Sequence, residues 1–441
     1  MDGGRMRVEQ KYKFVVIMFL SLLIGISVGL VISFFHQAVN WVIDNKSEFI
    51  YLYWPWNDML WVPYILTSAF MIFLSVRLVR YLAPETRGSG IQEIEGVVSN
   101  QRSMHEVRVI LVKFFGGVLS LGGNMAMGKE GPSVQIGGAF GQLASHFFTL
   151  DKEDLHILIV AGAGAGLATA FNAPLAGILF VFEEMRKSIK YTYISLQSVV
   201  LSVVASIVTL RIVFGNSISI PIDTLTAPQA YDMWIFAVLG LFFGVLGFIF
   251  NKYLLAFVNR ISGLDGWKFN VLILLIGALI GFLFYIFPDS VGEGYHIIHQ
   301  AVHENLSVDF LLILFAIRFF TTMLSYGTGA PGGIFAPMMA LGTLFGVAFG
   351  LLVKLYLPEV NIDPIVFAVV GMGALFSATV RAPLTGIVLV AEMTVSFNLL
   401  LPQLVTALVA TIVVNSMGGR AIYTILLENA FKVSKFGNKH H

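Results

Sequence analysis

The sequence predicts an all-α polytopic membrane protein made of two inverted-topology repeats, with broken helices that meet at the bilayer midplane. Three observations predict this fold class: the apolar composition, a series of long apolar segments, and an internal duplication interrupted by glycine and proline. We expect one transmembrane domain over residues 1–441, with a first repeat at about residues 10–215 and a second at about 225–430.

The composition is that of a membrane protein. Hydrophobic residues make up 57% of the chain and charged residues 12%, and the mean hydropathy is +0.83. An ordinary soluble domain has about 25% charged residues. The formal net charge of +1 offers no footprint for nucleic acid, and without cysteine the chain has neither disulfides nor thiolate metal sites.

The first apolar segment, residues 14–35, predicts a transmembrane helix. It runs for roughly 22 residues without a charge, long enough to cross a hydrocarbon core of about 30 Å and longer than the core of a secretory signal. Further apolar segments are helical candidates, because an open strand in lipid leaves its backbone groups without partners. They are residues 60–76, 194–210, 234–250, 271–287, 310–324, 341–355 and 401–414.

The internal duplication has two blocks. Residues 113–141 match residues 318–346 at one offset (318 − 113 = 205), and residues 162–178 match 371–387 at another (371 − 162 = 209). The two halves are therefore duplicates that differ by about four inserted residues. Membrane chains with this pattern bind ions where the broken helices meet.

Basic residues at both ends of the chain predict its orientation. They are Arg5, Arg7, Lys11 and Lys13 before the first segment, and Arg420, Lys432, Lys435 and Lys439 after the last. We expect both termini to face the cytoplasm, so the number of crossings is even. If each half crosses an odd number of times, the repeats lie in opposite orientations. We interpret His440 and His441 as a purification-tag remnant.

Three glycine-containing loops, residues 88–92, 128–132 and 332–337, predict an anion site. A helix that begins inside the membrane points free backbone N–H groups, and a partial positive charge of about half a unit, at whatever faces it. Glycine lets an anion approach the backbone closely, and proline fits a first helical turn.

These loops resemble the signature segments of the CLC family of chloride channels and chloride/proton exchangers. The resemblance covers nearly the whole chain, through residues 83–91, 113–117, 171–180 and 418–423 in the family's order. It implies a homodimer in the lipid bilayer, with one pore in each subunit, that transports chloride and protons and needs no cofactor.

Ser89 is the first implied chloride ligand. Its spacing from Gln92 is also that of a capping box, which closes the start of a helix. The resemblance makes the Ser89 hydroxyl a donor to a dehydrated chloride at the inner end of a central site, with Gly88 and Gly90 supporting the loop. Gln92 stands where the family commonly has proline.

Tyr423, Ile334 and Phe335 complete the implied chloride site. A tyrosine near the last membrane segment is often an interfacial anchor, but the surroundings of Tyr423 resemble those of the family's chloride-contacting tyrosine. The resemblance assigns the backbone amides of Ile334 and Phe335 to the same ion. Neutral dipoles can replace hydration without trapping the ion as firmly as a lysine would.

Glu130 is the implied gate. An acid in a first helical turn can also simply pair with the helix dipole, worth roughly 0.3–1 kcal/mol at a surface. The repeat sets Glu130 opposite Phe335 (335 − 130 = 205), so the duplication is asymmetric at its ion site. The resemblance makes Glu130 an external gate that competes with chloride and leaves when protonated, supported by Lys129 and Gly131 in the same loop.

Glu184 distinguishes an exchanger from a channel. Glu183 matches Glu392 at the second offset, whereas Glu184 meets a methionine. As an acid at a helix end, Glu184 can pair with Arg186 or Lys187. The segment resembles the one in which exchangers carry an internal proton-transfer glutamate, so the resemblance assigns that role to Glu184, with Glu183 wetting the access to it.

Other polar residues have simpler explanations. We expect Glu95 and Lys113, if buried, to form structural ion pairs. His296, His299 and His303 have the spacing of one helix face, but without cysteine or an acidic cluster we place them on a wet loop rather than at a zinc site.

Two partial motifs fail to indicate an enzyme. Residues 123–129 open like a phosphate-binding loop, but Glu130 follows where serine or threonine is needed. Residues 105–109 lack the second histidine of a zinc protease helix. We therefore expect a proton-coupled chloride antiporter, with a passive voltage- or pH-gated chloride channel of the same family as the alternative.

The chain ends soon after Tyr423. We therefore expect no cytoplasmic regulatory domain and a prokaryotic cell membrane as the location.

Overall fold

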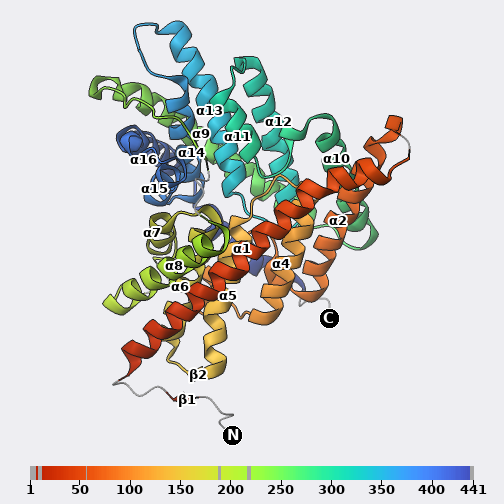
Figure 1. The fold of residues 1–441 in the computed structure, drawn as a ribbon, viewed down its shortest axis with the longest axis vertical. Coiled ribbons are helices and arrows are strands. Elements are labelled where there is room, and N and C mark those ends of the chain that lie inside the picture. The colour runs from red at the N-terminus through yellow and green to blue at the C-terminus, as the bar shows by residue number, and fades with distance from the viewer. Residues whose placement is uncertain (1–5, 8–11, 56, 187–189, 216–219, 438–441) are drawn as a thin grey trace.

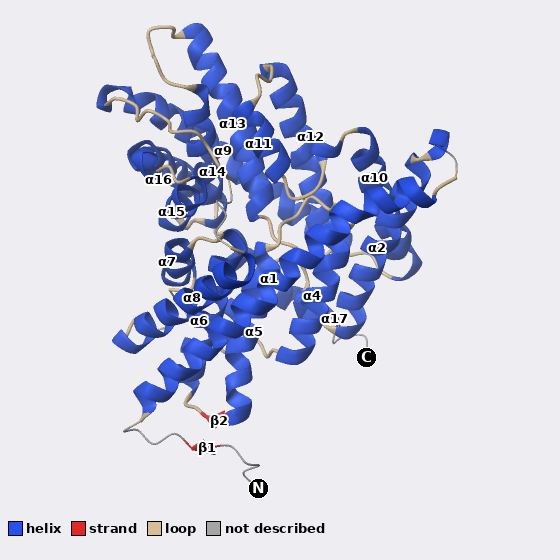
Figure 2. Ribbon diagram, viewed as in Figure 1, coloured by secondary structure: helices blue, strands red, loops and turns tan. Residues whose placement is uncertain are grey.

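The structure is a computed structural model that describes residues 6–7, 12–55, 57–186, 190–215 and 220–437. Figure 2 shows that its architecture is helical, with one short parallel pairing of β1 (Met6–Arg7) and β2 (Phe148–Thr149). Arg5, Lys11, Lys439, His440 and His441 lie outside the described residues.

Within the described residues, each half of the chain contributes eight helices in the same order. The first half has α1 (Lys13–Tyr53), α2 (Trp61–Leu82), α3 (Ile91–Val98), α4 (Glu106–Gly122), α5 (Glu130–Phe147), α6 (Lys152–Phe171), α7 (Pro174–Glu184) and α8 (Tyr193–Phe214). The second has α9 (Met233–Ser262), α10 (Gly266–Ile286), α11 (Tyr295–His303), α12 (Val308–Gly327), α13 (Phe335–Tyr356), α14 (Pro364–Val380), α15 (Pro383–Thr394) and α16 (Leu400–Ser416). The helix α17 (Ile422–Gly437) follows, and short 3₁₀ turns lie at Asn57–Met59, Pro84–Thr86, Ala230–Asp232, Pro288–Ser290 and Phe397–Leu399.

Each predicted membrane segment coincides with a helix, although residues 60 and 287 lie one position outside α2 and α10. Among the described residues, nine helices are long and apolar enough to cross a membrane, so the polytopic prediction is confirmed. The segment at residues 14–35 is only part of α1, a helix of 41 residues that Figure 1 shows running diagonally across the molecule. The span α6 was not predicted separately, because its glycines and alanines, from Ala161 to Gly166, dilute the apolar signal.

The two repeats meet at one antiparallel bridge. The Gly128 N–H donates to the Gly333 carbonyl oxygen at 2.8 Å, and the Gly333 N–H donates to the Gly128 carbonyl oxygen at 2.7 Å. Two residues that exchange both hydrogen bonds are related by a local two-fold axis. Gly128 and Gly333 are also equivalent in the duplication (333 − 128 = 205), so the axis that relates the inverted repeats passes between them.

Glycines bring neighbouring helices of each repeat into backbone contact. A Cβ atom on Gly137 of α5 would lie 2.1 Å from the carbonyl oxygen of Gly162 on α6. The second repeat has the same arrangement at Gly342 and Gly371, where the corresponding distance is 2.3 Å. Close backbone approach is a main source of helix association in lipid, where apolar burial contributes little. These two pairs fix the directions of α5 and α13.

Contacts between the repeats flank this centre on both sides. The helix α2 packs against α10 and α7 packs against α15, and Figure 1 shows these pairs on opposite sides of the molecule. The N-terminal ends of α5 and α13 lie between them, where the two repeats share the Gly128–Gly333 bridge.

Candidate functional site

The three loops predicted to bind an anion converge at the bridge between the repeats. The helix α5 begins at Glu130 and α13 begins at Phe335, the two positions that the duplication makes equivalent. A Cβ atom on Gly131 would lie 2.8 Å from the Cα of Ser89 and 3.0 Å from the Cα of Gly333. Two helix N-termini and the Ser89 loop therefore face one small volume.

The Glu130 carboxylate lies within this volume. Its side chain is 1% exposed, and its Oε1 accepts a hydrogen bond of 3.2 Å from the Tyr295 hydroxyl. Its Oε2 receives no hydrogen bond from the described residues and packs over the two bridge glycines, where a Cβ on Gly128 would lie only 2.0 Å from it. The carboxylate thus occupies a place where helix N-termini favour a small anion.

Ser89 is buried and lies just before α3. Its hydroxyl accepts a 3.4 Å hydrogen bond from the Ile91 N–H, and its own N–H donates to the Tyr326 hydroxyl at 3.3 Å. Gln92 does not complete a capping box, because its side-chain amide donates to the Arg87 carbonyl oxygen at 3.3 Å. Ser89 therefore accepts a hydrogen bond at the start of α3, but the return bond from the Gln92 side chain that a capping box requires goes to Arg87 instead.

Tyr423 contributes a second buried hydroxyl. Its hydroxyl lies close to the Ser89 side chain but does not reach good hydrogen-bond geometry with any of the described residues. A buried hydroxyl without a protein partner is available to donate to a bound ion or water. The Tyr423 ring lies 6.1 Å from the ring of Phe335, which also contacts Phe171 and Phe376, so aromatic rings enclose this end of the site.

The glycines of the Ser89 loop are required by its backbone. Gly88 has φ +61° and Gly90 has φ +83°, in the left-handed region that side chains disfavour. The Gly88 carbonyl oxygen accepts hydrogen bonds from the Gly332 N–H at 3.0 Å and from the Lys113 ammonium at 2.7 Å. The first and third predicted loops are therefore tied directly to each other.

Lys113 is an anchor of this loop rather than half of an ion pair. It is fully buried, and its ammonium donates to the carbonyl oxygens of Thr86 and Gly88. The ion pair expected for Lys113 is thus wrong, because the turn before α3 leaves carbonyl groups that need donors inside the membrane.

The second repeat carries a copy of this loop that the sequence alignment missed. Arg318, the equivalent of Lys113, donates to the carbonyl oxygens of Val291 and Gly292 at 2.9 and 2.8 Å. Gly292 and Gly294 have φ +69° and +103°, and they follow Gly88 and Gly90 at a third offset (292 − 88 = 204). Pro84 also matches Pro288 at this offset, but the side chains between the glycines and directly after them differ, so the identities are scattered and the alignment at 205 passes over them.

This second loop brings an acid and a tyrosine to Glu130. Glu293 forms an ion pair of 3.2 Å with Lys129, and both side chains are only 11% exposed. Lys129 also donates to the Asn40 side chain at 2.9 Å. Neither Glu293 nor Tyr295 was singled out from the sequence, because both stand outside the matched blocks.

Glu184 lies apart from Glu130, at the C-terminal end of α7. Both acids act electrostatically on the Tyr423 hydroxyl, so Tyr423 is a shared neighbour. Arg186 is exposed, and Lys187, the other suggested partner of Glu184, lies outside the described residues.

Glu183 of the first repeat caps α15 of the second, and Glu392 of the second repeat caps α7 of the first. The Glu183 carboxylate accepts from the Leu384 and Thr385 N–H groups at 3.1 and 2.7 Å, at the start of α15. The Glu392 carboxylate accepts from the first N–H groups of α7 at 3.0 and 2.8 Å. The structure therefore gives Glu183 a capping role where the sequence suggested a wet access path.

The three histidines lie on a helix, α11, and not on a loop as expected. The rings of His299 and His303 stack at 4.2 Å, and His296 pairs with Asp289 at 2.8 Å. In the described part of the chain, no cluster of three or more histidine, cysteine or acidic residues could hold a metal ion.

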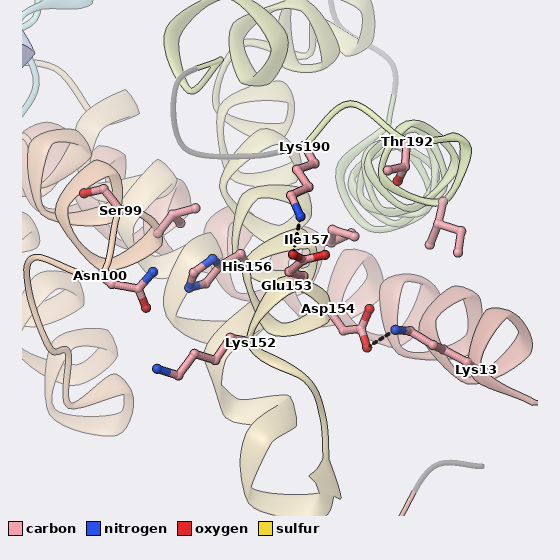
Figure 3. A pocket seen from close by; sticks show the side chains of 12 residues that line it. Lys13, Ser99, Asn100, Lys152, Glu153, Asp154, His156, Ile157, Lys190 and Thr192 are labelled. Atoms are coloured by element: carbon pink, nitrogen blue, oxygen red, sulfur yellow. Dashed lines mark hydrogen bonds and ion pairs between the residues drawn. The ribbon is translucent and has the colours of Figure 1, made fainter. Parts of the chain in front are cut away.

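A separate cavity of about 660 Å³ opens beside the N-terminal end of α6. Figure 3 shows two ion pairs among its charged side chains: Lys13 with Asp154 at 2.8 Å, and Lys190 with Glu153. None of the predicted site residues lines it, so it is not the anion site.

Comparison with known proteins yields both sequence and structural matches. The family profile described as "Voltage gated chloride channel" matches residues 70–415. The chain is 45% identical over 429 residues to "H(+)/Cl(-) exchange transporter ClcA" of Vibrio cholerae serotype O1 (strain M66-2), covering 95% of this chain and 90% of the relative. The protein of the same name from Vibrio vulnificus (strain YJ016) is 43% identical over 423 residues, covering 95% and 91%.

A solved structure described as a slow cyanobacterial Cl⁻/H⁺ antiporter superposes on this chain with a TM-score of 0.90 at 37% sequence identity. The match covers 94% of this chain and 97% of that one.

Replacing Glu183 by alanine removes the acceptor for two N–H groups of α15. We expect a loss of about 0.5–2 kcal/mol in the free energy of unfolding, the usual cost of removing an N-terminal cap. Thermal unfolding of the purified protein in detergent measures this loss, and Glu392→Ala should behave alike. The exposed Glu304→Ala variant is the control; equal melting temperatures for all three variants would contradict the capping role.

Proposed function

The chain belongs to the family of voltage-gated chloride channels, and we propose that it is an antiporter that exchanges Cl⁻ for H⁺ across the membrane. The observation that carries this proposal is the buried Glu130 carboxylate, held between two helix N-termini at the point where the repeats meet. A titratable anion at an anion site links the two ions, because the ionised carboxylate and chloride compete for the same place and protonation of the carboxyl frees that place for chloride. The relatives named as exchange transporters favour an antiporter over a channel.

The proposed chloride ligands are the Ser89 and Tyr423 hydroxyls and the backbone amides of Ile334 and Phe335. Their support is geometric: the two hydroxyls are buried and adjacent, and Phe335 opens α13 beside them. A dehydrated chloride needs several donors, and neutral donors hold it without making its release slow. Gly88, Gly90 and Gly131 leave the backbone close enough to the ion, and Lys129 adds positive charge nearby.

Glu130 is the proposed external gate. With its carboxylate ionised, the side chain competes with chloride for the space between α5 and α13. With the carboxyl neutral, attraction to the helix N-termini is lost and the side chain can leave, which opens the path for chloride. A local movement of one side chain is sufficient for this step, so the repeats need not rock against each other.

Glu184 is the proposed internal proton acceptor. Glu184 is the last residue of α7, and its charge acts electrostatically on the Tyr423 hydroxyl. Protons would pass between Glu184 and Glu130 while chloride passes Ser89 and Tyr423, so the two paths share only the outer part of the pore.

Further properties follow from the family resemblance as proposals. They are a homodimer with one pore in each subunit, both termini in the cytoplasm of a prokaryotic cell, no resident cofactor and no enzymatic activity. We also propose that residues 1–441 form one transmembrane domain, with repeats at about 10–215 and 225–430.

Proteoliposomes with a chloride gradient test the proposed function. We expect outward chloride flow to drive proton uptake against a pH gradient, recorded with a chloride electrode and a pH electrode on the same vesicles. In a planar bilayer the reversal potential should shift with a pH gradient. A reversal potential that stays at the chloride equilibrium value at every pH would identify the alternative, a passive channel.

Replacing Glu130 by glutamine should abolish proton coupling. Glutamine has a similar size but cannot carry the proton or compete as an anion, so we expect chloride to flow without proton uptake and without strong pH dependence. Chloride and proton fluxes in the same vesicles measure the effect. Continued proton pumping by this variant would contradict the gating role.

Replacing Glu184 by glutamine should stop proton movement while chloride still flows, because the internal acceptor is lost but the anion site is intact. The matched control is Glu304→Gln, which changes an exposed acid that lies outside the site. Retained coupling in Glu184→Gln, at the level of the control, would show that protons use another residue.

A further inference from the structure

The second repeat's copy of the Ser89 loop has acquired different side chains. In the first repeat Gly88 and Gly90 flank Ser89, and Ile91 opens α3. In the second, Gly292 and Gly294 flank Glu293, and Tyr295 opens α11. Ser89 is proposed to lie at the inner end of the pore. Because the repeats are inverted, the equivalent loop of the second repeat lies toward the outer end.

The two new side chains both act on Glu130. The Tyr295 hydroxyl donates directly to the Glu130 Oε1 at 3.2 Å. Glu293 pairs with Lys129, the residue that precedes Glu130, and its charge also acts on Glu130 through space. The pair is shielded from solvent, so its field is weakly screened.

We propose that Tyr295 and Glu293 are positioning residues that set the pH at which Glu130 takes up its proton. This inference rests on the proposed function, in which protonation of Glu130 opens the pore. A hydrogen bond from Tyr295 stabilises the ionised carboxylate and so holds the gate closed. The negative charge of Glu293 has the opposite effect: it disfavours a second charge nearby and neutralises Lys129, which would otherwise stabilise the ionised gate.

Other groups around Glu130 give no comparable control. From α1, Asn40 is neutral and serves Lys129, and His36 is buried near Lys129. From α17, the Tyr423 hydroxyl lies near Glu130 but makes no hydrogen bond with the described residues. From α12, Arg318 is directed to the carbonyl groups of the second loop. A matched pair of variants, one at Tyr295 and one at Glu293, can therefore distinguish the two opposite effects on the protonation of Glu130.

The test measures chloride efflux from proteoliposomes over a series of pH values set equally on both sides, for wild type, Tyr295→Phe, Glu293→Gln and the exposed control Glu304→Gln. Tyr295→Phe keeps the ring and removes only the donor, so the midpoint of activation should move to higher pH. Glu293→Gln keeps the shape and removes the charge, so the midpoint should move to lower pH. Each shift should be about one pH unit, the size expected for one interaction with a charged group.

Opposite shifts in the two variants, with the control at the wild-type midpoint, support the inference. A shift in only one variant, shifts in the same direction, or lower flux without any shift overturn it, since a merely structural role changes amplitude and leaves the midpoint alone. Gel filtration of each variant verifies that it folds. Failure of the proposed function is distinct: wild type itself would then show no chloride-driven proton uptake.

Discussion

The two hydrogen bonds between Gly128 and Gly333 are the constraint on which the rest of this structure depends. They place equivalent residues of the two repeats face to face, so the helices that follow, α5 and α13, begin at the same place from opposite sides. Backbone groups inside a membrane must find partners within the protein, and this bridge pairs backbone groups of Gly128 and Gly333 in the segments that precede both helices. It leaves the free N–H groups of the first helical turns for an ion.

Buried cations hold the two glycine loops without joining the transport path. Lys113 and Arg318 are equivalent in the duplication, and each directs its charge at carbonyl oxygens of the loop in its own repeat. Hydrogen bonds to carbonyl oxygens hold each cation away from the proposed chloride site, where a full positive charge would bind chloride too tightly for release. The proposed chloride site thus consists of dipoles, while Lys113 and Arg318 behind it hold the backbone that carries those dipoles.

The sequence predicted the fold class, the helical segments and the convergence of three loops, because long apolar runs and a fixed-offset repeat depend on chemistry that lipid enforces. It did not predict the capping by Glu183, the backbone partners of Lys113 or the approach of Tyr295 to Glu130. These interactions join residues that are far apart in the chain and that share no spacing rule. The copy of the Ser89 loop at Gly292–Gly294 was missed because its few identities, Pro288 and the two glycines among them, follow a separate offset of 204, and the residues between the glycines and directly after them differ.

The reciprocal capping by Glu183 and Glu392 has a consequence for how the protein is made. Each half supplies the carboxylate that the other half's short helix needs, so α7 leaves the ribosome with its first N–H groups unmet. Glu392 follows the first residue of α7 by 218 positions (392 − 174 = 218), so in synthesis this acceptor becomes available only after the intervening residues have been translated. The two halves thus depend on each other for the completed ends of α7 and α15, and not only for the ion site.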